Sequence, residues 1–167
     1  MTNPAAIIET VPELHKYSAD ADHVYCHPFD SRRDMDDFLV RLMSYKPVWL
    51  TLLYTIRGFL AGIMGLKHDE LINHSLKVSD YDFNRGGQVD FFYSVDFEAD
   101  RFWIGEVEDN HLTAYLGVIS DSDENGQHLY HVFTIVRYKN WLGPVYFNLI
   151  RPFSHLVVYC MGKYAAE

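Results

Sequence analysis

The sequence predicts an α+β fold of the helix-grip type, in which a curved antiparallel sheet is closed by a long C-terminal helix. Two observations in the second half of the chain carry this prediction. Four runs rich in Phe, Tyr, Val, Ile and Thr follow one another with only short turns between them, as in a meander of paired strands. A long apolar segment follows the last run. The runs are residues 88–97, 101–108, 111–120 and 128–138, and the apolar segment is 142–164.

The turns between these runs have the residues that tight hairpins need. The first is residues 98–100, the second is Asp109-Asn110, and the third ends in Asn125-Gly126. Asn, Asp and Gly tolerate the positive φ angles of tight turns, so each strand is expected to pair with the next. In the helix that follows, Pro152 is expected to cause a kink.

The first half of the chain is expected to supply one strand and two helices. Residues 18–27 are typical of a strand that Pro28 ends, and a helix starting at Asp30 or Ser31 follows. Pro47 ends that helix and begins a second one, which runs to about residue 66. We therefore expect one domain over residues 1–167, with its core at about 18–164.

Composition excludes some functional classes. The net charge is −9 without any basic run, which disfavours binding to nucleic acid. The two cysteines, Cys26 and Cys160, do not suggest a disulfide framework or a zinc site. The start of the chain lacks the features of a signal peptide, so a cytoplasmic location is expected. No motif indicates a cofactor.

Residues 48–66 leave two readings open. This stretch is almost as long as a membrane span and has a single charge, Arg57. A charge at the centre of a bilayer is costly, and polar residues lie on part of the surface. The buried helix is therefore favoured over a membrane span. In a buried helix Arg57 needs an acidic partner such as Glu106, or it serves as an anchor for a bound anion.

Two stretches carry a resemblance to a known family. In the first, the matching residues are Pro47, Val48, Trp49, Leu50, Leu53, Ile56, Arg57, Gly65, Leu66 and Lys67. In the second, they are Glu106, Asp109, Asn110, His111, Leu112, Thr134, Val136, Asn140, Leu142, Gly143, Tyr146, Phe147, Ile150, Pro152 and Phe153.

With these residues and this order of elements, the chain resembles an uncharacterised bacterial family, a domain of unknown function of the START-like superfamily of pocket proteins. The domain is also found as the tail of some NAD-dependent-epimerase-like proteins. The resemblance implies a helix-grip fold with a cavity. Members of the wider superfamily bind lipids, sterols, polyketides or aromatic compounds, and a few are cyclases or dehydratases.

Candidate ligand-binding residues come from strand alternation and from isolated polar groups in apolar surroundings. His111 and Tyr115 share one strand face, and a face that mixes aromatic with polar groups suits a binding cavity. Which face of the sheet lines the cavity stays open. The nine histidines form no metal-binding motif, and His23 and His27, although on one strand face, are about 13 Å apart along the strand. The candidates are Arg57, Glu106, His111, Tyr115, His131 and Tyr146.

Three functional classes follow, of which the first is the leading expectation and the second, an enzyme, is the alternative. The first is binding of a small apolar or amphipathic molecule in a cavity between the sheet and the C-terminal helix. The second is an enzyme that uses the same cavity for cyclisation, dehydration or hydrolysis, with Glu106, His111 and Tyr115 as its acid/base groups. The third is an interaction module with a filled cavity and an exposed apolar patch.

Overall fold

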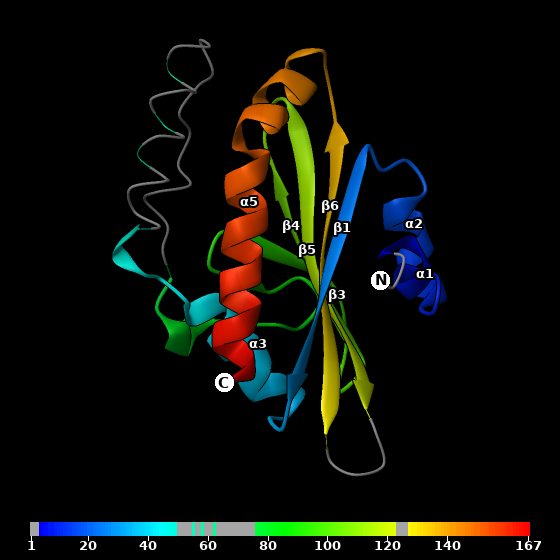
Figure 1. The fold of residues 1–167 in the computed structure, drawn as a ribbon, viewed down its shortest axis with the longest axis vertical. Coiled ribbons are helices and arrows are strands. Elements are labelled where there is room, and N and C mark those ends of the chain that lie inside the picture. The colour runs from blue at the N-terminus through cyan, green and yellow to red at the C-terminus, as the bar shows by residue number, and fades with distance from the viewer. Residues whose placement is uncertain (1–3, 50–54, 56–57, 59–61, 63–75, 123–126) are drawn as a thin grey trace.

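The computed structural model describes residues 4–49, 55, 58, 62, 76–122 and 127–167, and shows an antiparallel sheet between two helical layers (Figure 1). The six strands have the order β1-β6-β5-β4-β3-β2. The elements are α1 (Pro4–Ile8), η1 (Pro12–Leu14), α2 (His15–Ser18), β1 (His23–Ser31), α3 (Met35–Ser44), η2 (Val78–Asp80), β2 (Gln88–Val89), β3 (Phe92–Glu98), β4 (Phe102–Glu108), β5 (Leu112–Ser122), β6 (His128–Tyr138) and α5 (Leu142–Ala166).

The meander is confirmed, because β3, β4, β5 and β6 pair antiparallel in the order in which they occur in the chain. The first predicted run is divided in two. Val89 pairs with Phe92 across a tight turn, and Asp90 in that turn has a φ of 56°. Asp100, between β3 and β4, also has a positive φ of 60°. Aspartate tolerates this conformation better than most residues do, which explains its place in both turns.

The first strand lies further along the chain than predicted. Residues 15–18 form the short helix α2, and β1 runs straight through Pro28. A proline is tolerated here because β1 is an edge strand, bonded to β6 alone, so the missing N–H can point away from the ladder. The following helix starts later as well, at Met35, where the Asp34 carboxylate accepts a hydrogen bond of 2.8 Å from the Asp37 N–H.

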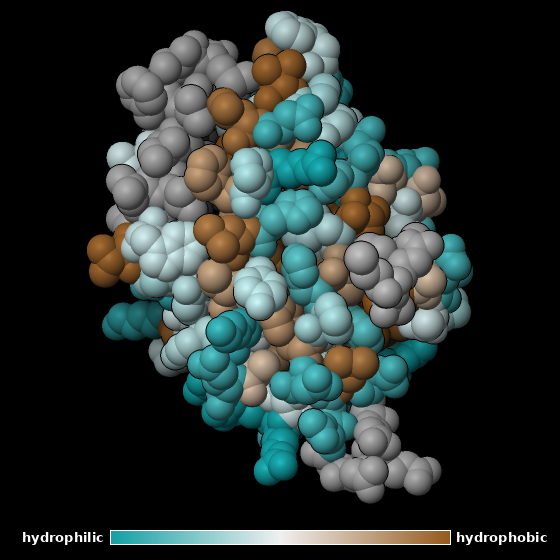
Figure 2. Space-filling model, viewed as in Figure 1, coloured by the Kyte–Doolittle hydropathy of each residue, from teal (hydrophilic) through white to brown (hydrophobic). Residues whose placement is uncertain are grey.

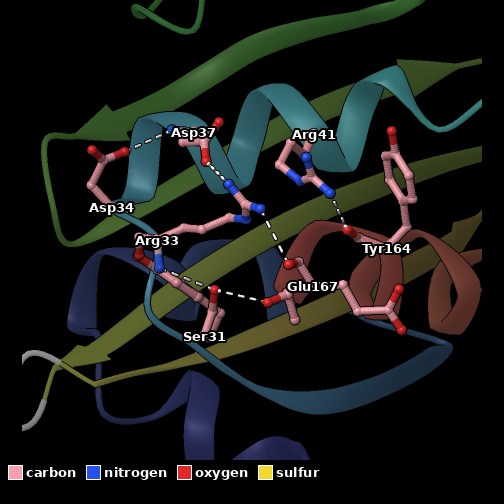
Figure 3. Close-up of polar contacts among 9 residues, drawn as sticks. Ser31, Arg33, Asp34, Asp37, Arg41, Tyr164 and Glu167 are labelled. Carbon is pink, nitrogen blue, oxygen red and sulfur yellow. Dashed lines mark hydrogen bonds and ion pairs between the residues drawn. The ribbon is translucent and has the colours of Figure 1, made fainter.

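Helix α5 continues through Pro152, and its N-terminal turns lean over the end of the sheet in Figure 1, as a bend at that proline would produce. Its other end is bound through arginine side chains to α3 and to the residues just before α3 (Figure 3). Arg33 donates to the Glu167 carbonyl at 3.2 Å, and Arg41 donates to the Tyr164 carbonyl at 3.2 Å. Guanidinium groups stabilise a helix C-terminus because they meet its unpaired carbonyls.

Each face of the sheet is covered by different elements. Helices α3 and α5 cover one face, while the N-terminal segment with α1 and α2 covers the other (Figure 1). Core side chains on the first face include Tyr25, Phe29, Trp103, Tyr130 and Val132. Core side chains on the second face include Ile104, Tyr115, Ile119, Phe133 and Ile135, packed against Ile7, Ile8, Val11, Leu14 and Tyr17.

The five N-terminal residues in this packing precede residue 18, so the packed part of the chain starts earlier than the expected core. Of the apolar stretch 48–66, only residues 48, 49, 55, 58 and 62 are among those described. In the described part of the chain, no helix is both long enough and apolar enough to cross a bilayer.

Candidate functional site

Aromatic rings from β1 and α5 meet along the edge of the sheet. Alternation in β1 directs every second side chain from residue 23 onward toward α5, and a spacing of four residues aligns side chains along one side of the helix. The two rows contact each other ring against ring. We call this group the ring cluster, and its members are His23, Tyr25, His27, Phe29, Phe147, His155 and Tyr159.

His155 lies at the centre of the ring cluster. Its imidazole stacks on the Tyr25 ring with a centroid separation of 3.7 Å and an interplanar angle of 22°. Its Nε2 atom lies 3.2 Å from Nε2 of His23. The third imidazole, that of His27, is 6.4 Å away and meets His155 edge-on. Three histidines from two elements are therefore collected around one tyrosine.

Two glycines bring the helix close enough for these contacts. A Cβ atom on Gly162 would lie 2.1 Å from the ring of Phe29, and one on Gly143 would lie 2.7 Å from the His111 carbonyl oxygen. Both distances are too short for any side chain, so the helix backbone itself packs on the sheet near its two ends. Between these glycines, α5 presents two polar groups to β1, namely Ser154 and His155, as well as the buried Val158.

The cluster contains both satisfied and unsatisfied polar atoms. The Tyr25 hydroxyl and Ser154 Oγ share a hydrogen bond of 2.7 Å. In contrast, His27 Nε2 is buried and has no hydrogen-bond partner among the described residues. Oγ1 of Thr134, opposite Tyr25 in the β1–β6 ladder, is also buried and makes no hydrogen bond of good geometry, although it interacts with the Tyr25 hydroxyl. Buried polar atoms without partners are uncommon in native proteins, because each costs about 1–3 kcal/mol.

The histidines of the cluster favour the neutral form. Burial lowers the pKa of His23, and the positive charge of Arg151 lowers it further. Burial also lowers the pKa of His27. For His155, burial is again the largest cause of a lowered pKa, followed by His23, Arg151 and His27. Neutral imidazoles near pH 7 each have one N–H donor and one acceptor nitrogen, so they can bind polar groups of either kind.

Metal binding has no support from this geometry. Among the residues that the structure describes, no group of three or more His, Cys, Asp or Glu side chains could hold a metal ion. The cluster's imidazoles interact instead by stacking and by one nitrogen–nitrogen contact.

Comparison with known proteins places the chain in a family. A family model described as a protein of unknown function, DUF2867, matches residues 17–161. The chain belongs to the DUF2867 family. Searches of curated proteins and of solved structures gave no match. The matched DUF2867 region includes all seven members of the ring cluster and ends shortly before the end of α5.

Three of the residues predicted as ligand-binding lie on the opposite face of the DUF2867 sheet. Glu106 and Tyr115 are cross-strand partners and share this face, and Tyr115 lies under the N-terminal segment. Tyr17 covers Tyr115 with a ring separation of 5.1 Å. Burial and the neighbouring Glu106 raise the pKa of Tyr115 to about 12. His131 is buried on this same face, paired across the ladder with Ile119.

The other three predicted residues are separated from these. His111 lies just before β5, where its Nδ1 contacts the Asn140 amide group. Tyr146 is buried on the α5 side, with Leu112 and Phe147. Arg57 is outside the described residues, and so is its predicted pairing with Glu106. The structure thus brings Glu106 and Tyr115 together but not His111, which leaves the predicted acid/base group incomplete.

Sequence reasoning missed the ring cluster for an identifiable reason. The shared strand face of His23 and His27 is visible in the alternation, but their separation along the strand argued against a joint site. His155 fills the space between them from a helix far away in the sequence. Two patterns in the sequence could have indicated the cluster. Aromatic rings recur at every second residue of the strand, and His155 and Tyr159 are four residues apart in the helix.

Proposed function

We propose that this DUF2867 domain binds a small apolar or amphipathic molecule between the sheet and the C-terminal helix, at the ring cluster. The observation that carries the proposal is the buried, unpaired Nε2 atom of His27, which lies beside the aromatic rings as does the buried Oγ1 of Thr134. A site with mostly apolar walls and a few placed polar groups is typical of small-molecule binding. A ligand that hydrogen-bonds these atoms would remove their desolvation cost.

Access to the cluster supports the same proposal. Strand β1 forms one edge of the sheet, so nothing in the ladder covers its outer side. Tyr159 is 48% exposed and Leu156, next to His155, is 50% exposed. Figure 2 shows hydrophilic residues gathered down the middle of this face, beside apolar residues that follow α5. An amphipathic molecule would meet a polar group and an apolar surface together here.

The resemblance to START-like proteins agrees with this placement. In such a helix-grip arrangement the C-terminal helix lies across the sheet, and members of that superfamily bind lipids, sterols or aromatic compounds. The ring cluster is at the corresponding boundary between α5 and the sheet.

Acid/base catalysis at the same cluster is the second candidate, and the contact between His23 and His155 favours it. Two neutral imidazoles with their Nε2 atoms 3.2 Å apart can relay a proton. The two functions differ in a simple observable, since only an enzyme changes the mass of a bound compound over time.

The first test is native mass spectrometry of freshly purified protein, followed by thermal shift with decanol, decanoate and 1-naphthol. We expect a co-purified compound, or a rise in melting temperature with at least one of these probes. A protein that carries no bound compound and shows no shift with any probe would overturn the proposal.

Variants sharpen this test. Thr134→Val removes the buried hydroxyl at nearly constant volume, so it should raise the melting temperature of the free protein and reduce the shift with the ligand. The matched control is Thr113→Val, which changes a buried threonine on the opposite face of the sheet and should leave the ligand-induced shift unchanged. Equal effects of both variants on the ligand-induced shift would remove the ring cluster as the site.

A further inference from the structure

Arg151 is placed at the ring cluster but has no partner there. It lies midway between Phe147 and His155 on the same side of α5, because the three are spaced four residues apart. Both of these neighbours contact His23. Among the described residues, Arg151 makes no hydrogen bond or ion pair, and it is exposed. Its charge nevertheless acts on both His23 and His155, whose pKa values it lowers.

The groups that face the cluster from each element are either basic or neutral. Strand β1 contributes His23, Tyr25 and His27, and α5 contributes Arg151, His155 and Tyr159. Strand β6 contributes Thr134 and Tyr138, which have no charge near pH 7.

Within the described part of the chain, no carboxylate is among the groups that shift the pKa of the three histidines. The nearest acid in sequence, Asp22, accepts a hydrogen bond of 2.7 Å from the Tyr138 N–H. The whole chain has 23 acidic residues against 14 Lys and Arg. Among the described residues, the site therefore has one guanidinium, three imidazoles and no facing acid, and this charge is complementary to an anion.

Building on the proposed function, we infer that the ligand is an anionic amphiphile whose carboxylate is held by Arg151 and by the His23–His155 pair, with uptake of a proton on binding. The guanidinium supplies N–H groups in a planar fork that suits a carboxylate. The apolar part of the ligand then lies along the rings of the cluster and the exposed side chain of Leu156.

The uptake of a proton follows from the geometry of the histidine pair. At a separation of 3.2 Å, one Nε2 donates to the other, so only one N–H is present between them. A carboxylate that contacts both nitrogens needs an N–H on each. The second N–H arises by protonation of the acceptor imidazole from solvent rather than by a change of its tautomer, because the negative charge of the carboxylate stabilises an imidazolium beside it.

The experiment is isothermal titration calorimetry with decanoate, decanol and acetate, between about pH 8 and about pH 6, in two buffers of different ionisation enthalpy. We expect decanoate to bind with uptake of close to one proton, and its affinity to rise up to about tenfold for each unit by which the pH falls. Decanol is expected to show no such dependence. Acetate, which has the head group without the chain, is expected to bind far more weakly than decanoate.

The matched variants are Arg151→Gln and Lys163→Gln, which each remove one exposed cation from α5. Arg151→Gln should weaken decanoate binding about tenfold and leave decanol binding unchanged, whereas Lys163→Gln should change neither. Both positions are exposed, so the melting temperature of the free variants should stay near that of the parent protein.

The outcomes separate this inference from the proposed function. If decanol binds as tightly as decanoate at every pH, or if Arg151→Gln and Lys163→Gln behave alike, the inference is wrong and the proposed function stands. If neither long-chain probe binds, the inference is wrong, and the proposed function is wrong as well when 1-naphthol gives no shift and no compound co-purifies. If acetate binds as tightly as decanoate, the apolar chain contributes nothing and the amphiphile is the wrong ligand class.

Discussion

Tyr25 stacks on His155 with ring centroids 3.7 Å apart, while its hydroxyl shares a hydrogen bond of 2.7 Å with Ser154, the residue before His155. One tyrosine of the edge strand therefore binds two consecutive residues of α5. This double contact holds the middle of the helix to the sheet, whereas the close backbone contacts at Gly143 and Gly162 lie near the two ends of the helix.

Replacing this hydroxyl should weaken the attachment of the helix without disturbing the stacking. We expect Tyr25→Phe to lower the free energy of unfolding by about 1 kcal/mol, because it removes one hydrogen bond and keeps the ring. Ser154→Ala should have a similar effect. In urea denaturation the double variant should lose less than the sum of the two single losses; strict additivity would show that the bond contributes nothing.

The stability of the protein should fall in mild acid because of the ring cluster. Burial lowers the pKa values of His23, His27 and His155 in the folded state. As the pH drops through about 6.5, the unfolded chain takes up these protons first, so the free energy of unfolding decreases. Above that range both states are neutral and the effect vanishes.

Urea denaturation between about pH 7.5 and about pH 5 measures this dependence. His155→Phe keeps an aromatic ring beside Tyr25 and should make the decrease in stability shallower. His15→Asn, at an exposed histidine of α2, should leave the decrease unchanged. An identical pH dependence in the parent protein and in His155→Phe would contradict the explanation.

Close packing of α5 on β1 should make Gly162 intolerant of any side chain. A Cβ at this position would lie 2.1 Å from one atom of the Phe29 ring, so the helix or the ring has to move. We expect Gly162→Ala to lower the free energy of unfolding by about 1–3 kcal/mol. Gly62→Ala is the control, because nothing lies within 4 Å of its added Cβ and alanine favours a helix. A neutral Gly162→Ala would show that the helix is free to shift outward.

The buried indole of Trp103 depends on one serine. Its Nε1–H donates to Ser94 Oγ at 3.0 Å, and that hydroxyl donates to the Phe83 carbonyl at 2.6 Å. Ser94→Ala leaves both groups unpaired in the core, so we expect a loss of about 1–3 kcal/mol and a changed tryptophan emission. Ser79→Ala, at an exposed serine of η2, should cause neither change. Unchanged stability in Ser94→Ala would mean that water replaces the serine hydroxyl.

Much of the fold was predictable because its determinants are local. Turn residues such as Asp109 and Asn110 specify which strands pair, and the apolar run after Tyr138 specifies the helix. The position of β1 was not predictable in the same way. A proline is expected to end a strand that has a neighbouring strand on each side, because it cannot donate to the ladder. Only the sheet order shows that β1 is an edge strand with a neighbour on one side.

The candidate site was harder to predict than the fold, because alternation divides residues into two faces but does not say what covers each face. Tyr115 and His131 mix aromatic and polar character as a cavity wall would, yet the N-terminal segment covers them. Most of that segment lies before residue 18, where the expected core began. The pairing of His23 with His155 depends on the angle and register of α5 on the sheet, which no local pattern records.

The N-terminal segment also has a consequence for the order in which this chain acquires its structure. Leu14 and Tyr17 pack against β4, β5 and β6, and Arg137 of β6 donates to the carbonyls of Lys16 and Tyr17 at 2.6 and 3.1 Å. During synthesis these residues leave the ribosome before β6 does, but the surface that receives them exists only once β6 has been made. Until then their apolar side chains are exposed to water and to other chains. The interval before β6 emerges is therefore when a newly made molecule is most open to aggregation and to chaperones.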